Sequence, residues 1–380
     1  MNLFEVEKKI NDEKLHYKFK MLKDSLIEEK EIIQEWSKGF IDKDNKFAYE
    51  FQTTFHSSFW ELYLHTVFKE AKFTLDYSKQ VPDFIVKLPF EFYVEAVVAN
   101  IKEKGLKEEE RTFMDTFIGL EALHLNPNFN QIIDESIVRY SNAIRSKTMK
   151  YKNEYSTKDW INKEASFTLA LASYDQINYG VEFIYPLMAL LYGLYFDVES
   201  QSYGQKDHIL KPGTDAKIKL NIFSDKEFED ISAIIFTCTL TIGKLTSLVI
   251  SKGKYSLNKV FCIRHDISDD VFPYKLNKVS PATPEHLSDG LIVFHNPRAK
   301  SPLPIGLFKE TNALQIHAKG SSDLQLISEN LPLVARVNSV FLRLFNDEMI
   351  MDLMIKYNGL DDKMLLDLMM KDLGFKFSEK

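Results

Sequence analysis

Three short stretches decide the fold of this chain: FWELYLHTVF at 59–68, VPDFIV at 81–86 and FYVEAVV at 92–98. The first is apolar almost all round at helical spacing, which predicts a buried helix. The other two are rich in β-branched and aromatic residues, which predicts strands. Each stretch holds one carboxylate among apolar neighbours. Because buried carboxylates are costly unless paired, hydrogen-bonded or bound to a metal, the pattern indicates a site that holds a cation.

The three carboxylates are Glu61 on the predicted helix, Asp83 at the start of the second stretch and Glu95 inside the third. Side chains alternate along a strand, so Glu95 and Val97 share one face. Simpler explanations exist for two of them: Glu61 as a solvated helix residue, and Pro82-Asp83 as a turn that starts a strand. Glu95 is the hardest to explain without a function, because it interrupts a strongly apolar strand.

A helix Glu, then Pro-Asp, then Glu followed two residues later by Lys is the motif of the PD-(D/E)XK nuclease superfamily, which has the restriction-endonuclease-like fold. The order Glu61, Pro82-Asp83, Glu95-Ala96-Val97 resembles it over roughly residues 50 to 175. The resemblance implies that Asp83 and Glu95 bind Mg²⁺ or Mn²⁺ and that a lysine positions or activates water. The motif is short and degenerate, but the order of the predicted elements agrees with it.

This sequence departs from the motif because Val97 stands at the lysine position. Either a lysine from another element replaces it, or catalysis is lost. Residues 131–152 are predicted to form a helix, and Lys147 interrupts its apolar seam. Lys147 is therefore the first candidate, although a lysine can also lie over an apolar seam with its charge in water. Lys87, on the same strand face as Asp83, is the second candidate.

Composition agrees with a globular protein of more than one structural unit. The chain has 380 residues, 45% of them hydrophobic, and a formal net charge of −7. That charge argues against a general nucleic-acid coat but not against a nuclease. Cys238 and Cys262 are too few for a disulfide framework or zinc cluster and are expected to be buried free thiols. The chain shows no signal-peptide core and no run long enough to span a membrane, so we expect a cytoplasmic protein without membrane contact.

The expected fold is α/β, with a mixed central sheet flanked by helices. We expect a helical segment at 1–50, the nuclease-like core at 51–200, a second α/β region at 201–320 and a helical C-terminal region at 321–380. No linker separates the second region from the core, and the strand at 231–238 is expected to extend the core's sheet. The segment 101–130 is expected to be a long connection that forms a flap near the site. The Met-rich tail is expected to pack on the body or on a second copy in a homodimer.

By resemblance, the expected function is that of a Mg²⁺-dependent endonuclease acting on nucleic acid, with DNA as the expected substrate. Asp83 and Glu95 would hold the metal, Glu61 a second ion, and Lys147 would assist catalysis. The alternative is an inactive nuclease fold that binds nucleic acid or a protein, for which Val97 is the best argument. A third hypothesis, a structural protein without a metal, would follow if Mg²⁺ and Mn²⁺ do not bind.

Overall fold

The structure is a computed structural model, and it describes residues 1–99, 105–111, 122, 125–174, 176–269, 271–318, 324–344, 346–360, 364 and 367. About half of the segment 101–130, which was expected to form a flap, lies outside the described residues, as does the Met-rich tail beyond 367.

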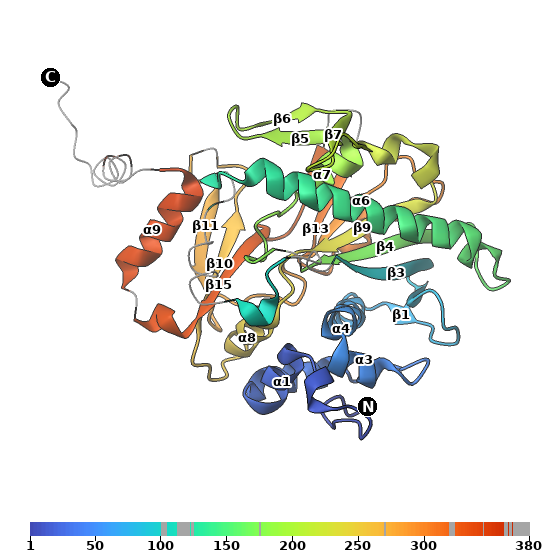
Figure 1. Cartoon of the computed structure of the whole chain (residues 1–380), viewed down its shortest axis with the longest axis horizontal. Coiled ribbons are helices and arrows are strands. Elements are labelled where there is room, and N and C mark those ends of the chain that lie inside the picture. Colours follow the sequence, from blue (N-terminus) through green and yellow to red (C-terminus); the bar gives the residue numbers. More distant parts are fainter. Residues whose placement is uncertain are drawn as a thin grey trace.

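Figure 1 shows helices on both sides of the central sheet. Their bounds are α1 Tyr17–Asp24, α2 Ile27–Trp36, α3 Phe47–Thr53, α4 Phe55–Glu70, α6 Phe129–Asn153, α7 Tyr185–Tyr192, α8 Ile242–Ser251 and α9 Asp347–Asn358. The short helices α1 to α3 lie beside α4, which confirms that the N-terminal segment is helical. The long helix α6 crosses the molecule on the other side of the central sheet.

A mixed sheet of eight strands forms the centre of the protein, in the order β1-β2-β3-β4-β9-β12-β13-β14. Its strands are β1 Thr74–Leu75, β2 Phe84–Leu88, β3 Phe92–Ala99, β4 Ser166–Ser173, β9 Ile231–Thr237, β12 Ile292–His295, β13 Leu314–Ala318 and β14 Leu324–Ile327. β1, β2 and β3 are antiparallel neighbours, whereas β3, β4 and β9 run parallel. This architecture confirms the expected α/β class with a mixed central sheet.

The remaining strands form three small sheets. Their bounds are β5 Leu194–Asp197, β6 Ser202–Gln205, β7 His208–Leu210, β8 Lys217–Lys219, β10 Lys259–His265, β11 Tyr274–Lys278 and β15 Leu333–Ser339. β5 pairs with β6 and β7 with β8, while β11, β10 and β15 form a three-stranded sheet. β7 and β8 form an antiparallel hairpin whose turn contains Pro212 and Gly213, and Gly213 has a positive φ of 77°.

Alternation along the strands sends side chains to two hydrophobic cores, one on each face of the central sheet. On β3, Tyr93 packs into the core beneath α6 and α7, whereas Phe92 and Val94 pack into the core with α4 and α8. Glu95 follows the periodicity of Tyr93 and faces α6. The site residues on β3 are therefore placed by the same pattern that builds the core.

The strands of the second α/β region complete the central sheet. β9 pairs with β4 in parallel, and β12 pairs with β9. The expectation that the strand at 231–238 extends the sheet is therefore confirmed. Both cysteines, Cys238 and Cys262, are buried and free, as expected.

One expectation about the C-terminal region is wrong. We predicted a helical region at 321–380, but β14 and β15 lie within that range, followed by α9. Leu324 and Leu326 are two positions apart and both pack against the core beneath α6, which is strand periodicity rather than helix periodicity. Among the described residues, no helix is long and apolar enough to cross a membrane.

Candidate active site

The hairpin of β2 and β3 brings Asp83 and Glu95 to opposite positions. Phe84 pairs with Val94 and Ile85 with Tyr93, so Asp83 and Glu95 each lie one residue beyond the last pair of the ladder. Asp83 precedes the first residue of β2, and its Oδ2 accepts a hydrogen bond from the backbone N–H of Ala96 at 2.6 Å. The Asp83 carboxylate therefore binds a backbone N–H of β3 just past the end of the strand pairing. This hydrogen bond holds the carboxylate next to Glu95, the residue before Ala96.

Glu95 is buried, with 2% of its surface exposed, and three donors converge on it. Lys147 Nζ donates to Oε1 at 2.7 Å and Lys150 Nζ donates to the same oxygen at 3.2 Å. The Tyr155 hydroxyl donates to Oε2 at 2.9 Å. Burial and the charge of Glu95 both raise the pKa of Tyr155, which keeps its hydroxyl a donor.

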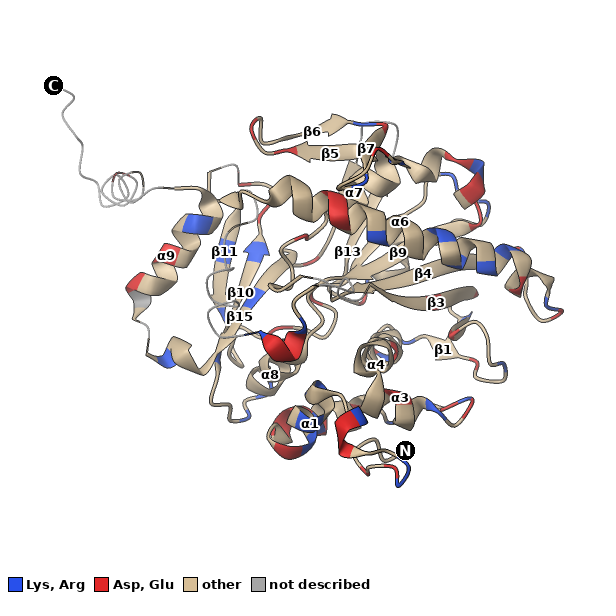
Figure 2. Cartoon of the chain, viewed as in Figure 1, with Lys and Arg blue, Asp and Glu red and all other residues tan. Residues whose placement is uncertain are grey.

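The predicted approach of Lys147 to Glu95 is therefore confirmed. α6 crosses over β3, so a residue on its sheet-facing side reaches the middle of that strand (Figure 1). The ammonium group of the second candidate, Lys87, pairs with Glu91 rather than with Asp83 or Glu95, and the Lys87 side chain is 41% exposed. Figure 2 shows that basic residues recur along the C-terminal half of α6, which carries Lys147 and Lys150.

Glu61 and Lys43 also interact with Asp83, Glu61 through its charge and Lys43 through both its charge and a hydrogen bond. Lys43 Nζ donates to the backbone oxygens of Asp83 at 2.6 Å and Pro82 at 3.1 Å. Burial, and then the charge of Asp83, raise the pKa of Glu61 well above its ordinary value, while Lys43 opposes that shift. Burial lowers the pKa of Lys43, and the charges of Asp83, Glu61 and Glu95 oppose that shift.

Two carboxylates of this site, Asp83 and Glu61, are destabilised in their ionised forms, chiefly by burial. Burial, followed by the charge of Glu95, raises the pKa of Asp83 to about 6. Raised pKa values at Asp83 and Glu61 mean that the ionised carboxylates are destabilised in the absence of a cation. Such a site gains stability from any cation that binds between them.

A second polar cluster, which the sequence did not reveal, lies at the carboxyl ends of β3 and β4. In the described part of the chain, His16, His56 and Glu108 are the only three His, Cys, Asp or Glu residues whose ligand atoms all lie within 4.8 Å of one another. Glu61, Asp83 and Glu95 thus do not form such a compact triad.

The charges around this second cluster argue against a metal ion there. Lys18 Nζ donates to Glu108 Oε1 at 2.5 Å, and His56 Nε2 lies 2.8 Å from Oε2. Although burial opposes it, these partners lower the pKa of Glu108 to about 2, so its charge is fully compensated. Arg111, which also acts electrostatically on Lys18, adds a further positive charge. The cluster therefore joins α1, α4 and the 105–111 segment as a buried ion pair.

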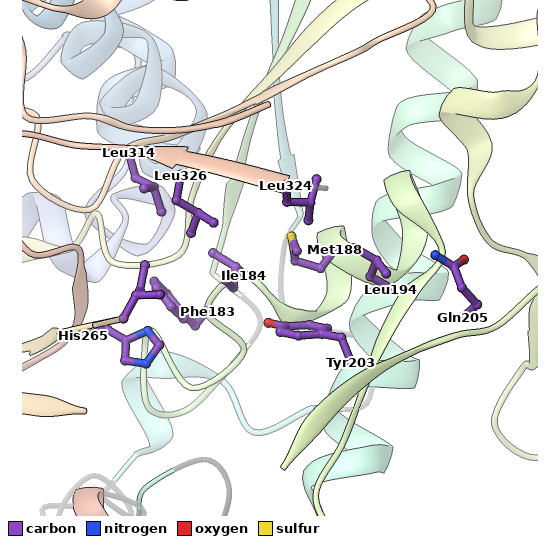
Figure 3. A pocket seen from close by; sticks show the side chains of 11 residues that line it. Phe183, Ile184, Met188, Leu194, Tyr203, Gln205, His265, Leu314, Leu324 and Leu326 are labelled. Atoms are coloured by element: carbon purple, nitrogen blue, oxygen red, sulfur yellow. The ribbon is translucent and has the colours of Figure 1, made fainter. Parts of the chain in front are cut away.

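An apolar pocket of about 470 Å³ lies elsewhere, between α7 and the strands β13 and β14. Figure 3 shows Leu314, Leu324 and Leu326 on one side of it, with Ile184 and Tyr203 opposite. Its polar lining residues are few and do not converge, unlike those of typical small-molecule sites. The pocket therefore adds no chemistry to the β2–β3 site.

No family model, no curated protein and no solved structure matches this chain. The interpretation of the site therefore depends on its own geometry and charges.

Proposed function

We propose that this protein is a metal-dependent nuclease that hydrolyses phosphodiester bonds in nucleic acid, with DNA as the expected substrate. The observation that carries this proposal is the arrangement of Lys147 on Glu95, opposite Asp83. It supplies a carboxylate pair and an adjacent ammonium group although Val97 stands at the motif position. The order of helix, antiparallel hairpin and crossover helix supports the same proposal.

The residues present fit Mg²⁺ or Mn²⁺. Both cations prefer oxygen ligands, and Asp83 and Glu95 offer carboxylate oxygens from neighbouring strands. The side chains of the two lysines that bond Glu95, Lys147 and Lys150, are 24% and 39% exposed, so solvent reaches this side of the carboxylate. A bound divalent cation would polarise the scissile phosphate and lower the pKa of an attacking water.

The chain's own groups have separable roles in this proposal. Asp83 and Glu95 hold the cation, and Glu61 adds negative charge that favours a second ion. Lys147 places a positive charge where the phosphorane develops negative charge, which stabilises the transition state electrostatically. Tyr155 holds the orientation of Glu95 through its hydroxyl, and Lys43 fixes the backbone on which Asp83 stands.

A cleavage assay tests this proposal. Full-length protein is incubated with labelled single-stranded and duplex DNA and with RNA, in Mg²⁺, Mn²⁺ or EDTA. We expect cleavage of at least one substrate in Mg²⁺ or Mn²⁺ and none in EDTA, because the cation supplies the activation of water and phosphate. Binding without cleavage in any metal would contradict the nuclease and favour the second candidate.

The second candidate is an inactive nuclease fold that binds nucleic acid or a protein. Val97 favours it, as does the closure of Glu95 by three donors, which leaves less room for a ligand cation. Isothermal titration with Mg²⁺ and Mn²⁺ separates the two candidates. Heat of binding that Glu95→Gln removes supports the nuclease, whereas no binding contradicts it and leaves the inactive fold and the structural protein without a metal.

The raised pKa of Asp83 predicts the stability of the metal-free protein. An acid whose folded pKa is about 6, above its ordinary value of 3.8, costs stability when it is ionised. That cost is present above pH 6 and disappears as the pH falls toward 3.8. Asp83→Asn is therefore expected to raise the melting temperature by about 2 °C near neutral pH in EDTA, and by less as the solution is acidified.

Differential scanning fluorimetry across this pH range measures the effect, with Glu154→Gln as the control. Glu154 is an exposed carboxylate at the end of α6, so its replacement is expected to leave the pH dependence unchanged. A lower melting temperature for Asp83→Asn in EDTA near neutral pH would show that the carboxylate is a net stabilising group, contrary to the charge argument.

A further inference from the structure

The segment that follows α6 lies along the β2–β3 hairpin, beside the candidate active site. The Trp160 indole N–H donates to the backbone oxygen of Val81 at 3.4 Å, two residues before Asp83. The backbone N–H of Asn162 donates to the Tyr93 hydroxyl at 2.8 Å. At the start of this segment, Tyr155 bonds Glu95, and at its end Trp160 and Asn162 bond the β2–β3 hairpin. Residues 155–162 therefore lie at the rim of the site.

Trp160 is the exposed tryptophan of the chain. Its exposed fraction is 38%, whereas Trp36 and Trp60 are 5% and 0% exposed and belong to the core around α4. An indole that packs only for stability would be expected to lose more of its surface than this. Trp160 instead keeps its nitrogen end fixed by Val81 and leaves ring surface accessible to solvent.

Two lysines flank this ring. Lys79, from the connection between β1 and β2, has its Nζ 5.1 Å from the ring centroid, and Lys158 has its Nζ 5.8 Å away. Both distances are within the range of cation–π contacts. Lysine is a flexible point charge, so the same ammonium groups can move from the ring to phosphate oxygens. An accessible ring between two mobile cations has the chemistry that single-stranded nucleic acid requires.

We propose that Trp160 is a stacking platform for an unpaired nucleobase, with Lys79 and Lys158 contacting the neighbouring phosphates. The inference depends on the proposed nuclease function and specifies its substrate as single-stranded or locally unpaired nucleic acid. In a duplex every base already stacks on its neighbours, so a platform at the rim of the site favours strands whose bases are free. Stacking tolerates any base, so the platform selects strandedness rather than sequence.

The test measures binding in EDTA, where cleavage does not occur. Full-length protein is titrated with a fluorescein-labelled oligothymidylate of about twenty nucleotides, its duplex with oligoadenylate, and the corresponding oligouridylate. The anisotropy of the fluorescein label measures binding for every variant, and in the wild type quenching of intrinsic fluorescence reports mainly on Trp160, because Trp36 and Trp60 are buried. We expect Trp160→Ala to weaken binding of the single strand about tenfold and binding of the duplex by less than about twofold.

Matched variants separate stacking from folding and from charge. Trp160→Phe retains a stacking ring and is expected to bind close to wild type, which also tests for misfolding in Trp160→Ala. Tyr255→Ala, which removes a 71% exposed ring on the loop before β10, is expected to change nothing. Lys79→Gln and Lys158→Gln each remove one phosphate contact, so each is expected to reduce the slope of log affinity against log salt concentration by about 0.7. Trp160→Phe removes no charge and is expected to leave this slope unchanged.

The outcomes distinguish this proposal from the nuclease itself. If Trp160→Ala binds the oligothymidylate as wild type does, the platform is wrong, whether or not the protein cleaves in Mg²⁺. If Trp160→Ala loses single-strand binding but wild type cleaves no substrate in any metal, the platform stands and the nuclease is wrong. Preferential loss of oligouridylate rather than oligothymidylate binding would assign the platform to RNA.

Discussion

Replacing Glu95 with glutamine is expected to reduce metal-dependent cleavage by at least about a thousandfold, or roughly 4 kcal/mol of activation free energy. Glutamine keeps the shape of the side chain but removes the charge that would hold the cation. Asp83→Asn is expected to have an effect of the same size, because its amide oxygen can still accept the Ala96 N–H while the charge is lost. Initial rates of oligonucleotide cleavage in Mg²⁺ and Mn²⁺ measure both effects.

The fold should survive both substitutions, which makes loss of cleavage interpretable. Asp83→Asn removes a carboxylate whose ionised form is destabilised by burial first and by the charge of Glu95 second. Glu95→Gln keeps a side-chain oxygen that can still accept hydrogen bonds from the donors around Glu95. Glu154→Gln, close in sequence to Tyr155 but exposed, is the control and should cleave within about twofold of wild type, as surface substitutions usually do. Retention of more than about a tenth of wild-type cleavage by Glu95→Gln would place the active site elsewhere.

The sequence alone predicted the elements that carry the carboxylates, because their patterns are local. FWELYLHTVF at 59–68 is apolar all round and lies inside α4, and the β-branched run FYVEAVV at 92–98 lies inside β3. The turn between the strands is short, so the antiparallel pairing of β2 and β3 follows from proximity in the chain. The register pairs Phe84 with Val94, which brings the neighbouring residues Asp83 and Glu95 to the same end of the hairpin.

Lys147 could be predicted for a different reason. A single lysine in an otherwise apolar helical seam is costly unless an opposite charge compensates it, and the same holds for a glutamate such as Glu95 in an apolar strand. Because Lys147 and Glu95 carry opposite charges, a contact between them would compensate both, although they lie 52 residues apart in the chain. The structure confirms that contact at 2.7 Å.

The other contacts of the site had no local signal. Lys43 lies in a polar loop and Tyr155 follows the end of α6, and neither interrupts a periodic pattern. Their roles come from three-dimensional placement, since Lys43 reaches Pro82 and Asp83, and Tyr155 reaches Glu95. Trp160 likewise becomes noticeable only when its exposure and its neighbours are known.

The helix expected at 321–380 shows how a short apolar run misleads. Leu324, Leu326 and Ile327 satisfy both helical and strand spacing over so few residues. β14 forms because it can pair with β13 at the edge of the sheet, which is a tertiary contact that no local window contains. Tertiary context overrides propensity in such segments.

Lys147→Met is expected to reduce cleavage by at least about tenfold, or roughly 1.4 kcal/mol of activation free energy. Methionine keeps much of the bulk of the lysine stem over the α6 seam but removes the ammonium group that bonds Glu95 at 2.7 Å. Because Lys147 is 24% exposed and Glu95 keeps Lys150 and Tyr155 as donors, stability should change little. The loss should fall mainly on kcat, since a charge that acts on the phosphorane acts chiefly in the transition state.

Three further variants decide whether the charge of Lys147 replaces the motif lysine. Arg145→Met removes a cation of α6 that pairs with Glu227 instead, and it should cleave as wild type does. Lys150→Met, whose ammonium lies 3.2 Å from Glu95 and is more exposed, should have a smaller effect than Lys147→Met. Val97→Lys in the Lys147→Met background returns a lysine to the strand face that Glu95 occupies, and it should restore part of the lost kcat.

Wild-type cleavage by Lys147→Met would contradict the role of Lys147, because the charge would then be dispensable. A loss that Val97→Lys cannot restore, accompanied by a lower melting temperature in Lys147→Met, would instead assign Lys147 to the structure of the α6–β3 contact.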